Sequence, residues 1–327
     1  MDTQAIVFIA PGEVALQSIP MPDPRPGEVQ IRTRFSTISA GTEGWAFQDR
    51  FTWQPTPYPC VPGYERVGVI VALGAGVEGW QIGDTVMATV GAWDSPVKPH
   101  WGSHAALANT VARELYRLPP GTDEVDASGA VVAQVGYNAA SRVAMQPGDW
   151  VAVYGDGIIG QSAAQAARAR GARVVVVGHR PERLSLAAKH SADAAVNARD
   201  GDVVEQVQEI AGRKTVTAIL DSVQTEPAQR EYTPLLEHAR GQIVYCGFTP
   251  AATWADMGEL QKHEFTTHYV SGWTRPRMEA TLQLMAEGKI RLRPLITHLV
   301  PYAQGPDMYR MILGKSAPFM GITLDWT

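Results

Sequence analysis

The chain has 327 residues and a formal net charge of −5, and its basic residues are scattered, which argues against nucleic acid as a partner. No apolar run is long enough to span a bilayer, and the stretch MDTQAIVFIAPGEV lacks the basic and apolar segments of a secretory signal. We therefore expect a cytoplasmic protein with no membrane insertion. Its length exceeds the size at which single hydrophobic cores stop growing, so two domains are expected.

The first hundred or so residues are typical of a small antiparallel β domain. Short runs of alternating polar and apolar residues, such as EVQIRTR (28–34) and RVGVIVALG (66–74), are separated by turn signals rich in glycine and proline. Two cysteines, Cys60 and Cys246, are too far apart in the sequence for a metal motif or a disulfide framework. The pattern predicts a barrel-like arrangement of strands.

From about Ser128 the pattern changes to strands that alternate with helices, which predicts a doubly wound parallel sheet. The expected strands are 151–154, 173–177, 194–197, 218–221, 242–246 and 268–272. The last segment predicts a helix, a strand, a helix and a strand, at 278–290, 295–300, 305–316 and 320–326. We infer that the chain leaves the β domain and later returns to it, with the domains at 1–132 plus 272–327 and at 133–271.

A glycine-rich turn follows the expected strand 151–154. Gly155, Gly157 and Gly160 satisfy G-x-G-x-x-G, and Ile158 and Ile159 open the small-residue helix that follows. Such glycines form the tight turn, let the backbone approach a pyrophosphate and allow the helix to pack closely, while the helix start favours phosphate charge. The motif predicts a dinucleotide site, with an ordinary glycine-rich turn as the alternative.

The end of the next strand bears on the choice of dinucleotide. An NAD site usually has Asp or Glu there, whereas an NADP site has cations for the 2′-phosphate. This chain has Gly178, His179 and Arg180, with Arg183 one turn later, so a carboxylate is missing at the strand end where an NAD site would have it. NADP(H) is therefore expected to be preferred over NAD(H). The alternative is that both arginines simply solvate the start of a helix.

The chain as a whole resembles the medium-chain dehydrogenase/reductase superfamily of alcohol dehydrogenases and quinone oxidoreductases. The matching segments are PGEVQIRTRFSTISAGTE, VPGYERVG, QIGDTVMA, GSHAALA, QPGDWVAVYGDGIIGQSAAQAA, GQIVYCGF and PLITHLVPY. The resemblance implies an α/β fold in which a Rossmann domain is inserted in a GroES-like antiparallel barrel. GTE followed by Trp, VPGYE, LITH and LDW are most similar to the zinc-lacking group that includes bacteriochlorophyllide a dehydrogenase.

The positions that hold zinc in the superfamily's zinc enzymes carry other residues in this chain. They match Ala40, Tyr64 and Val131, of which alanine and valine have no donor atom and neutral tyrosine is a poor zinc ligand. We therefore expect no metal. His100 and His104 form the one close histidine pair of the β domain, but no third ligand is evident nearby, so a plain loop or strand edge is the favoured interpretation.

Without zinc, hydrogen-bond donors must stabilise the oxygen that gains charge during hydride transfer. The resemblance implies that Thr42 is the hydroxyl that relays the proton and that Tyr64 projects a phenol into the same cleft. Tyr64 can donate a proton if nearby positive charge lowers its pKa; a tyrosine between core and solvent is the alternative. Glu65, with Glu43, would orient these hydroxyls or pair with cations such as Arg66.

The remaining contacts are expected at a strand end and among aromatic side chains. Cys246, Gly247 and Phe248 follow the strand 242–246 and are expected to contact the nicotinamide and its ribose. Aromatic rings could line an apolar pocket for a bulky or planar substrate, with the ordinary core as the alternative. The candidates are Trp45, Trp53, Trp93 and Trp273.

These expectations predict a zinc-independent, NADP(H)-dependent oxidoreductase that acts on a carbonyl or secondary alcohol. One alternative is a reductase of quinones or of carbon–carbon double bonds in enones. The other is a nucleotide-binding protein without catalysis. The expected partner is a small-molecule substrate, and the resemblance implies a homodimer that forms through the edge strand around HYVSG.

Overall fold

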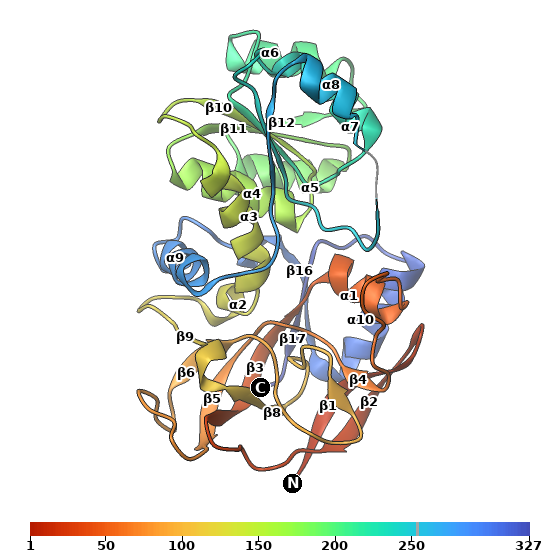
Figure 1. Ribbon diagram of the computed structural model, residues 1–327, viewed down its shortest axis with the longest axis vertical. Helices are drawn as coiled ribbons and strands as arrows, with labels where there is room; N and C mark the ends of the chain where they lie inside the picture. The colour runs from red at the N-terminus through yellow and green to blue at the C-terminus, as the bar shows by residue number, and fades with distance from the viewer. Residues whose placement is uncertain (253–254) are drawn as a thin grey trace. The chain divides into compact units, whose positions relative to one another are not determined.

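The computed structural model describes residues 1–252 and 255–327. It divides the chain into two compact units. Met1–Val131 and Ile296–Thr327 form the β unit, and Val132–Leu295 forms the α/β unit. Figure 1 shows the chain passing from β strands into alternating helices and strands, and ending in strands again. Among the described residues, no helix is both long and apolar enough to cross a membrane.

The β unit contains two sheets. The larger has the strand order β16-β17-β3-β5-β6-β9, with β8 paired to β3, and the smaller has the order β2-β1-β4-β7. The strands are β1 (Asp2–Ala10), β2 (Glu13–Pro20), β3 (Glu28–Ile38), β4 (Cys60–Val61), β5 (Arg66–Leu73), β6 (Thr85–Ala88), β7 (Lys98–Pro99), β8 (Leu107–Val111), β9 (Leu115–Arg117), β16 (Ile296–Pro301) and β17 (Gly321–Asp325). Most neighbouring strands are antiparallel, as the sequence predicts, whereas β16–β17 and β4–β7 are parallel.

The end of the chain completes the larger sheet. Strand β17 pairs antiparallel with β3, with Ile322 opposite Ile38. The unit also holds the helices α1 (Ala40–Phe47), α2 (Glu124–Ala127) and α10 (Gly305–Gly314). Phe8 of β1 packs against Phe47 of α1 and Tyr309 of α10, with ring centroids 4.8 and 4.9 Å apart. This aromatic contact fixes both helices on the smaller sheet.

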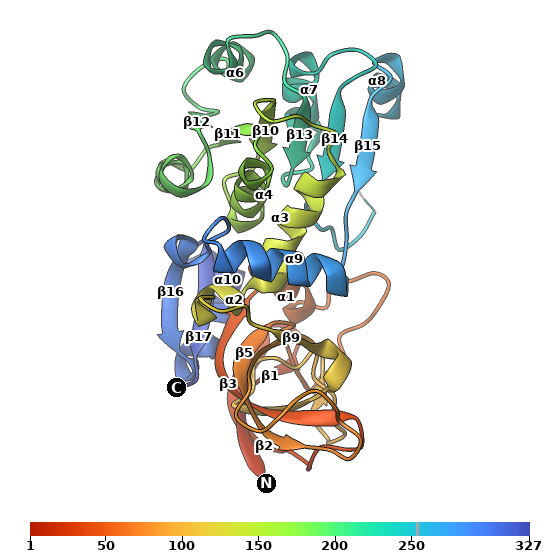
Figure 2. The ribbon, with the colours of Figure 1, turned by 90° about the vertical axis from the view of Figure 1, so that its left-hand side faces the viewer.

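The α/β unit is built on a six-stranded sheet of order β12-β11-β10-β13-β14-β15, in which neighbouring strands are parallel. Figure 2 shows the strands side by side in this order. They are β10 (Trp150–Tyr154), β11 (Arg173–Gly178), β12 (Ala194–Asn197), β13 (Ala218–Asp221), β14 (Gln242–Tyr245) and β15 (Thr266–Tyr269). The helices are α3 (Ala130–Arg142), α4 (Ile158–Ala169), α5 (Pro181–Leu186), α6 (Val203–Ala211), α7 (Glu226–Tyr232), α8 (Met257–Lys262) and α9 (Arg275–Ala286).

The apolar runs predicted as buried strands lie at the centre of this sheet. Every residue of β10 is buried, and so is every residue of β11 after Arg173. Helix α4 packs on β10 and β11. Continuous burial is the property of strands covered on both faces, which is why these runs are apolar throughout instead of alternating. The predicted doubly wound parallel sheet is confirmed.

The return of the chain to the β unit comes later than the sequence analysis places it. Residues 272–295, including α9, group with the α/β unit, and the β unit resumes at Ile296 instead of residue 272. Two hydrogen bonds show why: the Gln165 side chain of α4 donates to the Arg291 carbonyl at 3.1 Å and accepts from the Arg291 amide at 2.6 Å. Strand β15 also begins earlier than expected, because Thr266 lies opposite Gln242 of β14.

Candidate active site

Two residues of the predicted catalytic set meet in the β unit. Thr42 lies in α1, and Tyr64 lies between β4 and β5. The Tyr64 side chain is 8% exposed, and it makes side-chain hydrogen bonds with Ser39 and Thr42. The ring of Trp101 meets Tyr64 edge-on, with ring centroids 5.4 Å apart. The start of α1 and the segment before β5 therefore bring the hydroxyl of the buried Tyr64 together with that of the half-buried Thr42.

The environment of Tyr64 differs from the expected one in the sign of its charge. Burial raises the pKa of Tyr64, the carboxylates of Glu65 and Glu43 raise it further, and the hydrogen bonds with Ser39 and Thr42 only partly oppose this. The sequence analysis makes proton donation by Tyr64 conditional on nearby positive charge that lowers this pKa, whereas the charges that the protein itself places beside the phenol are negative. The phenol is therefore held in its protonated, neutral form.

Glu65 ties the start of β5 to the first turn of α3. Its carboxylate is fully buried, and its Oε2 atom accepts a hydrogen bond of 2.7 Å from the Val131 amide. Val131 is the residue that matches the third metal ligand of the zinc enzymes, and it contacts Glu65 through its backbone. The next residue, Arg66, is also fully buried and donates to the Gly102 carbonyl at 3.1 Å.

A buried acid and histidine form a network that the sequence analysis did not identify. Oε2 of Glu43 lies 2.9 Å from Nε2 of His104 and also accepts from the Tyr309 hydroxyl, while Oε1 accepts from the Ser39 amide at 2.7 Å. On its other side, Nδ1 of His104 lies 2.8 Å from Oγ of Ser36. His104 thus lies in a loop, as the favoured interpretation has it, but its side chain is buried in the packed interior. No local signal in the sequence points to this pairing.

Gly63 makes room for this histidine. Its φ angle is +88°, in the region that favours glycine, and a Cβ atom there would lie 2.5 Å from Nε2 of His104. A side chain at residue 63 would therefore displace the His104 ring from Glu43. The glycine before Tyr64 contributes to the geometry of the acid–histidine pair.

His100 does not join His104 in a ligand set. The His100 ring packs on Trp101 with centroids 4.1 Å apart, and burial lowers its pKa. Within residues 1–252 and 255–327, no three or more His, Cys, Asp or Glu side chains gather in a way that could hold a metal ion. The contacts of His104 with Glu43 and Ser36 occupy both of its ring nitrogens.

The glycine motif in the α/β unit forms a strand, a turn and a helix in the predicted order. Gly155 follows β10 with a φ of +117°, Gly157 is the N-cap of α4, and Ile158 and Ile159 begin the helix. A Cβ atom at Gly160 would lie 2.0 Å from the Gly155 carbonyl oxygen, so this glycine lets α4 pack against the turn. A Cβ atom at Gly157 would meet only Nη1 of Arg183, at 3.7 Å. The backbone at Gly157 is therefore open to close approach.

The expectation that no carboxylate lies at the end of β11 is wrong. Asp156, from the glycine turn, places its carboxylate there. Its Oδ2 atom accepts from the amides of His179 and Arg180 at 2.9 and 3.0 Å. Its Oδ1 atom lies 3.1 Å from Nη1 of Arg180 and 3.5 Å from Nη1 of Arg183. Inspection of the strand end alone misses this acid, because it comes from the neighbouring strand's turn.

The third predicted group of cofactor contacts lies at the same edge of the sheet. Cys246, Gly247 and Phe248 follow β14, and the carboxyl ends of parallel strands share one edge. Cys246 is buried, which raises its thiol pKa, whereas Phe248 is 43% exposed. Gly247 lies so close to Gln224 that a Cβ atom would be 2.2 Å from Oε1 of that residue. Of these three residues, Phe248 is therefore the one with a large exposed side chain.

The four candidate tryptophans do not share one environment. The Trp45 ring meets Phe51 edge-on with centroids 6.3 Å apart, and Trp53 lies 5.0 Å from Phe51 and is 56% exposed. Trp93 is buried in a core cluster, and its Nε1 atom donates to the Val97 carbonyl at 3.0 Å, so the core alternative describes it better. Trp273 belongs to the α/β unit. Trp45 and Trp53 remain candidates for the substrate pocket. Both lie between Thr42 and Tyr64 in the sequence.

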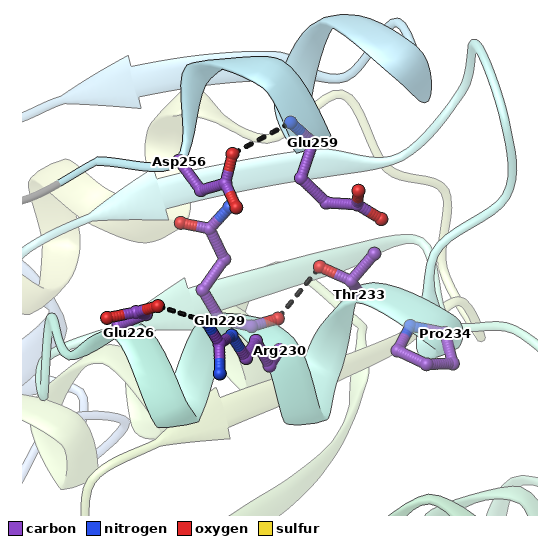
Figure 3. A pocket seen from close by; sticks show the side chains of 7 residues that line it. All are labelled: Glu226, Gln229, Arg230, Thr233, Pro234, Asp256 and Glu259. Atoms are coloured by element: carbon purple, nitrogen blue, oxygen red, sulfur yellow. Dashed lines mark hydrogen bonds and ion pairs between the residues drawn. The ribbon is translucent and has the colours of Figure 1, made fainter.

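A pocket between α7 and α8 contains none of the predicted site residues. It has a volume of about 210 Å³ and is shown in Figure 3. Its acids already have partners: Glu226 pairs with Arg230, Asp256 accepts from the Glu259 amide, and Glu259 pairs with Lys262 and His263. The pocket is lined by Glu226, Gln229, Arg230, Thr233, Pro234, Asp256 and Glu259. This pocket therefore offers no predicted catalytic or cofactor-binding side chain.

Comparison with known families decides the class of the chain. Residues 25–178 match the family described as "Alcohol dehydrogenase GroES-like domain", and residues 159–287 match the family described as "Zinc-binding dehydrogenase". Together these matches span residues 25–287, and they support the medium-chain dehydrogenase/reductase superfamily. The chain is an alcohol dehydrogenase-like oxidoreductase, with a GroES-like domain and a Rossmann-like parallel sheet.

Individual members of the superfamily are similar over nearly the whole chain. An alcohol dehydrogenase of Rhizobium meliloti (strain 1021) is 27% identical over 308 residues, which are 88% of this chain and 89% of that protein. An Escherichia coli CFT073 alcohol dehydrogenase in complex with NADH has a TM-score of 0.84 at 21% identity, and covers 99% of both chains. A Sinorhizobium meliloti 1021 dehydrogenase bound to NADP has a TM-score of 0.86 at 18% identity, with the same coverage. These two structures establish the shared fold.

Proposed function

We propose that this chain is a zinc-independent, NADP(H)-dependent reductase or dehydrogenase that acts on a carbonyl or secondary alcohol. The observation that carries the proposal is the buried, protonated Tyr64, in hydrogen-bond contact with Thr42, at the position that matches a zinc-binding histidine. A neutral phenol in a dry site donates a hydrogen bond to a substrate oxygen, which is the task that zinc performs in the zinc enzymes.

The residues at the matching metal positions do not suit zinc. Ala40 and Val131 offer no side-chain donor atom, and the raised pKa of Tyr64 keeps its oxygen protonated, which disfavours metal binding. His104, the histidine of the buried network, has its two ring nitrogens in contact with Glu43 and Ser36. The donor set therefore supports a mechanism that uses protein hydroxyls.

The turn after β10 fits the diphosphate of a dinucleotide. Gly157 leaves its backbone accessible, and α4 begins at the next residue with its unpaired amides. The related structures hold NADH or NADP, which supports a nicotinamide cofactor in this chain. When bound, the nicotinamide supplies or accepts the hydride.

The arginines at the end of β11 support NADP(H) over NAD(H). Arg180 is 44% exposed at its side chain, so its guanidinium is accessible to a phosphate, and Arg183 lies next to it around the same acid. A guanidinium binds a phosphate through paired, charge-assisted hydrogen bonds. NADH lacks the 2′-phosphate and loses this contact.

In the reduction direction the protein's own part is to supply a proton. Tyr64 donates its phenolic proton to the substrate oxygen as the hydride forms the new C–H bond, and the resulting phenolate takes up a proton from solvent afterwards. Thr42 and Ser39 orient the phenol through their hydrogen bonds. Trp45, Phe51 and Trp53 provide aromatic surface in the β unit, which favours a bulky or planar apolar substrate.

Turnover measurements test the proposal. The purified protein is assayed for NADPH and NADH consumption with a panel of aromatic ketones, quinones and enones, and its zinc content is measured on the same sample. The expected result is ketone-dependent oxidation, faster with NADPH, at a zinc content far below one ion per chain. Turnover of enones alone would establish the double-bond reductase. Cofactor binding without any turnover would establish a non-catalytic protein, and stoichiometric zinc would overturn the metal-free mechanism.

A further inference from the structure

The strand end that faces the expected 2′-phosphate carries an acid as well as two arginines. Asp156 is 2% exposed and accepts from two backbone amides and from the guanidinium groups of Arg180 and Arg183. Burial acts to raise its pKa, but the two amides and the two arginines outweigh this effect and lower the pKa. Asp156 is thus ionised where it meets the arginines.

The Asp156 side chain occupies the space that a side chain at residue 178 would otherwise fill. Gly178 is the last residue of β11, and a Cβ atom there would lie 2.5 Å from Cβ and 2.6 Å from Oδ2 of Asp156. The glycine turn therefore supplies the carboxylate that the strand itself does not carry. The acid is locked by its hydrogen bonds to the amides of His179 and Arg180.

The carboxylate of Asp156 reduces the net positive charge of the cluster that it forms with Arg180 and Arg183. Two guanidinium groups and one carboxylate leave one net positive charge, whereas a phosphomonoester carries about −1.5 to −2 at neutral pH. A 2′-phosphate approaching Arg180 must share it with Asp156, and it is repelled by the carboxylate at short range. A ribose hydroxyl carries no charge and meets no such repulsion.

We propose that Asp156 competes with the 2′-phosphate for Arg180 and Arg183, and so limits the preference of this chain for NADP(H) over NAD(H). The inference rests on the proposed function, because it assumes that a nicotinamide dinucleotide binds at the glycine turn. Asp156 is a specificity-determining residue that acts through the two arginines, and the chemistry at Tyr64 does not depend on it.

Binding measurements on Asp156→Asn test this inference. Asparagine has nearly the same shape and an oxygen that accepts from the two amides, but it has no charge. Titration calorimetry is performed with NADP(H) and NAD(H), and with the fragments 2′,5′-ADP and 5′-ADP. We expect NADP(H) and 2′,5′-ADP to bind about fivefold more tightly, the upper end of what one charge pair at a protein surface contributes, and NAD(H) and 5′-ADP to change less than about twofold.

A matched control and a double variant show whether the effect passes through the arginines. Asp193 also accepts from a backbone amide, that of Val174 at 2.7 Å, and pairs with Arg168 at 3.6 Å, but it lies at the amino end of β11. Asp193→Asn should leave all four affinities unchanged. In Asp156→Asn/Arg180→Ala the gain in NADP(H) affinity should largely disappear. Asp156→Ser also removes the charge, and serves if the asparagine variant does not fold.

The possible outcomes separate this inference from the proposed function. If the unmodified protein binds neither NADP(H) nor NAD(H), the proposed function fails. If it binds them and the neutral variants bind NADP(H) with unchanged or lower affinity, Asp156 only holds the turn together, and the inference alone is overturned.

Discussion

Tyr64 combines two properties: its hydroxyl is held by other hydroxyl groups, and the residue is almost completely buried. Its partners Ser39 and Thr42 come from the start of α1, and two buried carboxylates raise its pKa. Such a group is a weak acid in isolation. It becomes an effective hydrogen-bond donor when a substrate oxygen gains negative charge in the same dry site.

Replacing Tyr64 by phenylalanine removes the hydroxyl and keeps the ring. If the phenol donates the proton, turnover should fall by more than about tenfold while cofactor affinity is unchanged. Steady-state kinetics and cofactor titration measure the two effects. Tyr58→Phe is the control, because the Tyr58 hydroxyl donates to the Ala46 carbonyl at 2.7 Å in a structural role. Equal turnover of Tyr64→Phe and the unmodified protein would remove Tyr64 from the mechanism.

The pKa of Tyr64 predicts the alkaline side of the pH profile. The phenol must be protonated to donate, and its pKa is raised above the ordinary value of 10.0 by burial and by Glu65 and Glu43. Reduction should therefore show no loss of kcat from phenol ionisation as the pH rises from 7 to about 10. The measurement is kcat at saturating NADPH over this range. A decline centred below about pH 9 that is absent from Tyr64→Phe would contradict the raised pKa.

The sequence predicts contacts between site residues where a family pattern covers both residues, and it misses contacts that depend on the fold alone. It predicts that Thr42 and Tyr64 contribute to one site, because both match one family pattern. It misses the pairing of Glu43 with His104 and that of Asp156 with Arg180, since each joins segments that only the folded sheet brings together. A free carboxylate and a paired one are identical in the sequence.

At the level of elements, the central strands and the glycine turn could be predicted because they carry strong periodic and steric signals. Strands β12 and β13 have the expected bounds, Ala194–Asn197 and Ala218–Asp221. Edge strand β15 was misplaced, because its sequence THYVSG is mildly apolar throughout and its start depends on the register with β14. The boundary near residue 272 was misplaced because the bonds between Gln165 and Arg291 join residues far apart in the sequence.

Two glycines of the turn before α4 should respond differently to alanine. At Gly157 the new methyl group meets only Nη1 of Arg183 at 3.7 Å, so Gly157→Ala should lose no more than about 1 kcal/mol of unfolding free energy. The methyl group does, however, occupy the space that a pyrophosphate needs, and NADPH affinity should fall at least about tenfold. At Gly160 it overlaps the Gly155 carbonyl, so Gly160→Ala should lower stability and affinity together.

Urea denaturation and NADPH titration of both glycine variants provide the comparison. Stability is read from the denaturation midpoint and slope, and affinity from the quenching of tryptophan fluorescence. Normal NADPH affinity in a stable Gly157→Ala variant would show that no diphosphate approaches this turn. Such a result would leave the glycines with a purely structural role.

At the scale of the whole molecule, the parallel sheet ends in a strand that can pair with another chain. Strand β15 is the last in the order β12-β11-β10-β13-β14-β15, and its Tyr269 is 67% exposed and stacked on Tyr245 with centroids 5.3 Å apart. An edge strand with an exposed aromatic side chain is a site where β-sheets extend between chains. We therefore expect a homodimer in which two β15 strands meet.

Light scattering coupled to gel filtration tests this assembly. The unmodified protein should elute with twice the chain mass of 35.4 kDa. Tyr269→Glu introduces a like charge near the two-fold axis, where each copy meets the other, and should produce the single-chain mass. Leu299→Glu, at a residue that is 41% exposed on β16 of the β unit, should remain dimeric. Because the glycine turn follows β10, which is separated from β15 by β13 and β14 in the sheet, a monomeric Tyr269→Glu variant should still bind NADPH. A monomeric unmodified protein, or a dimeric Tyr269→Glu variant, would show that β15 is not the interface.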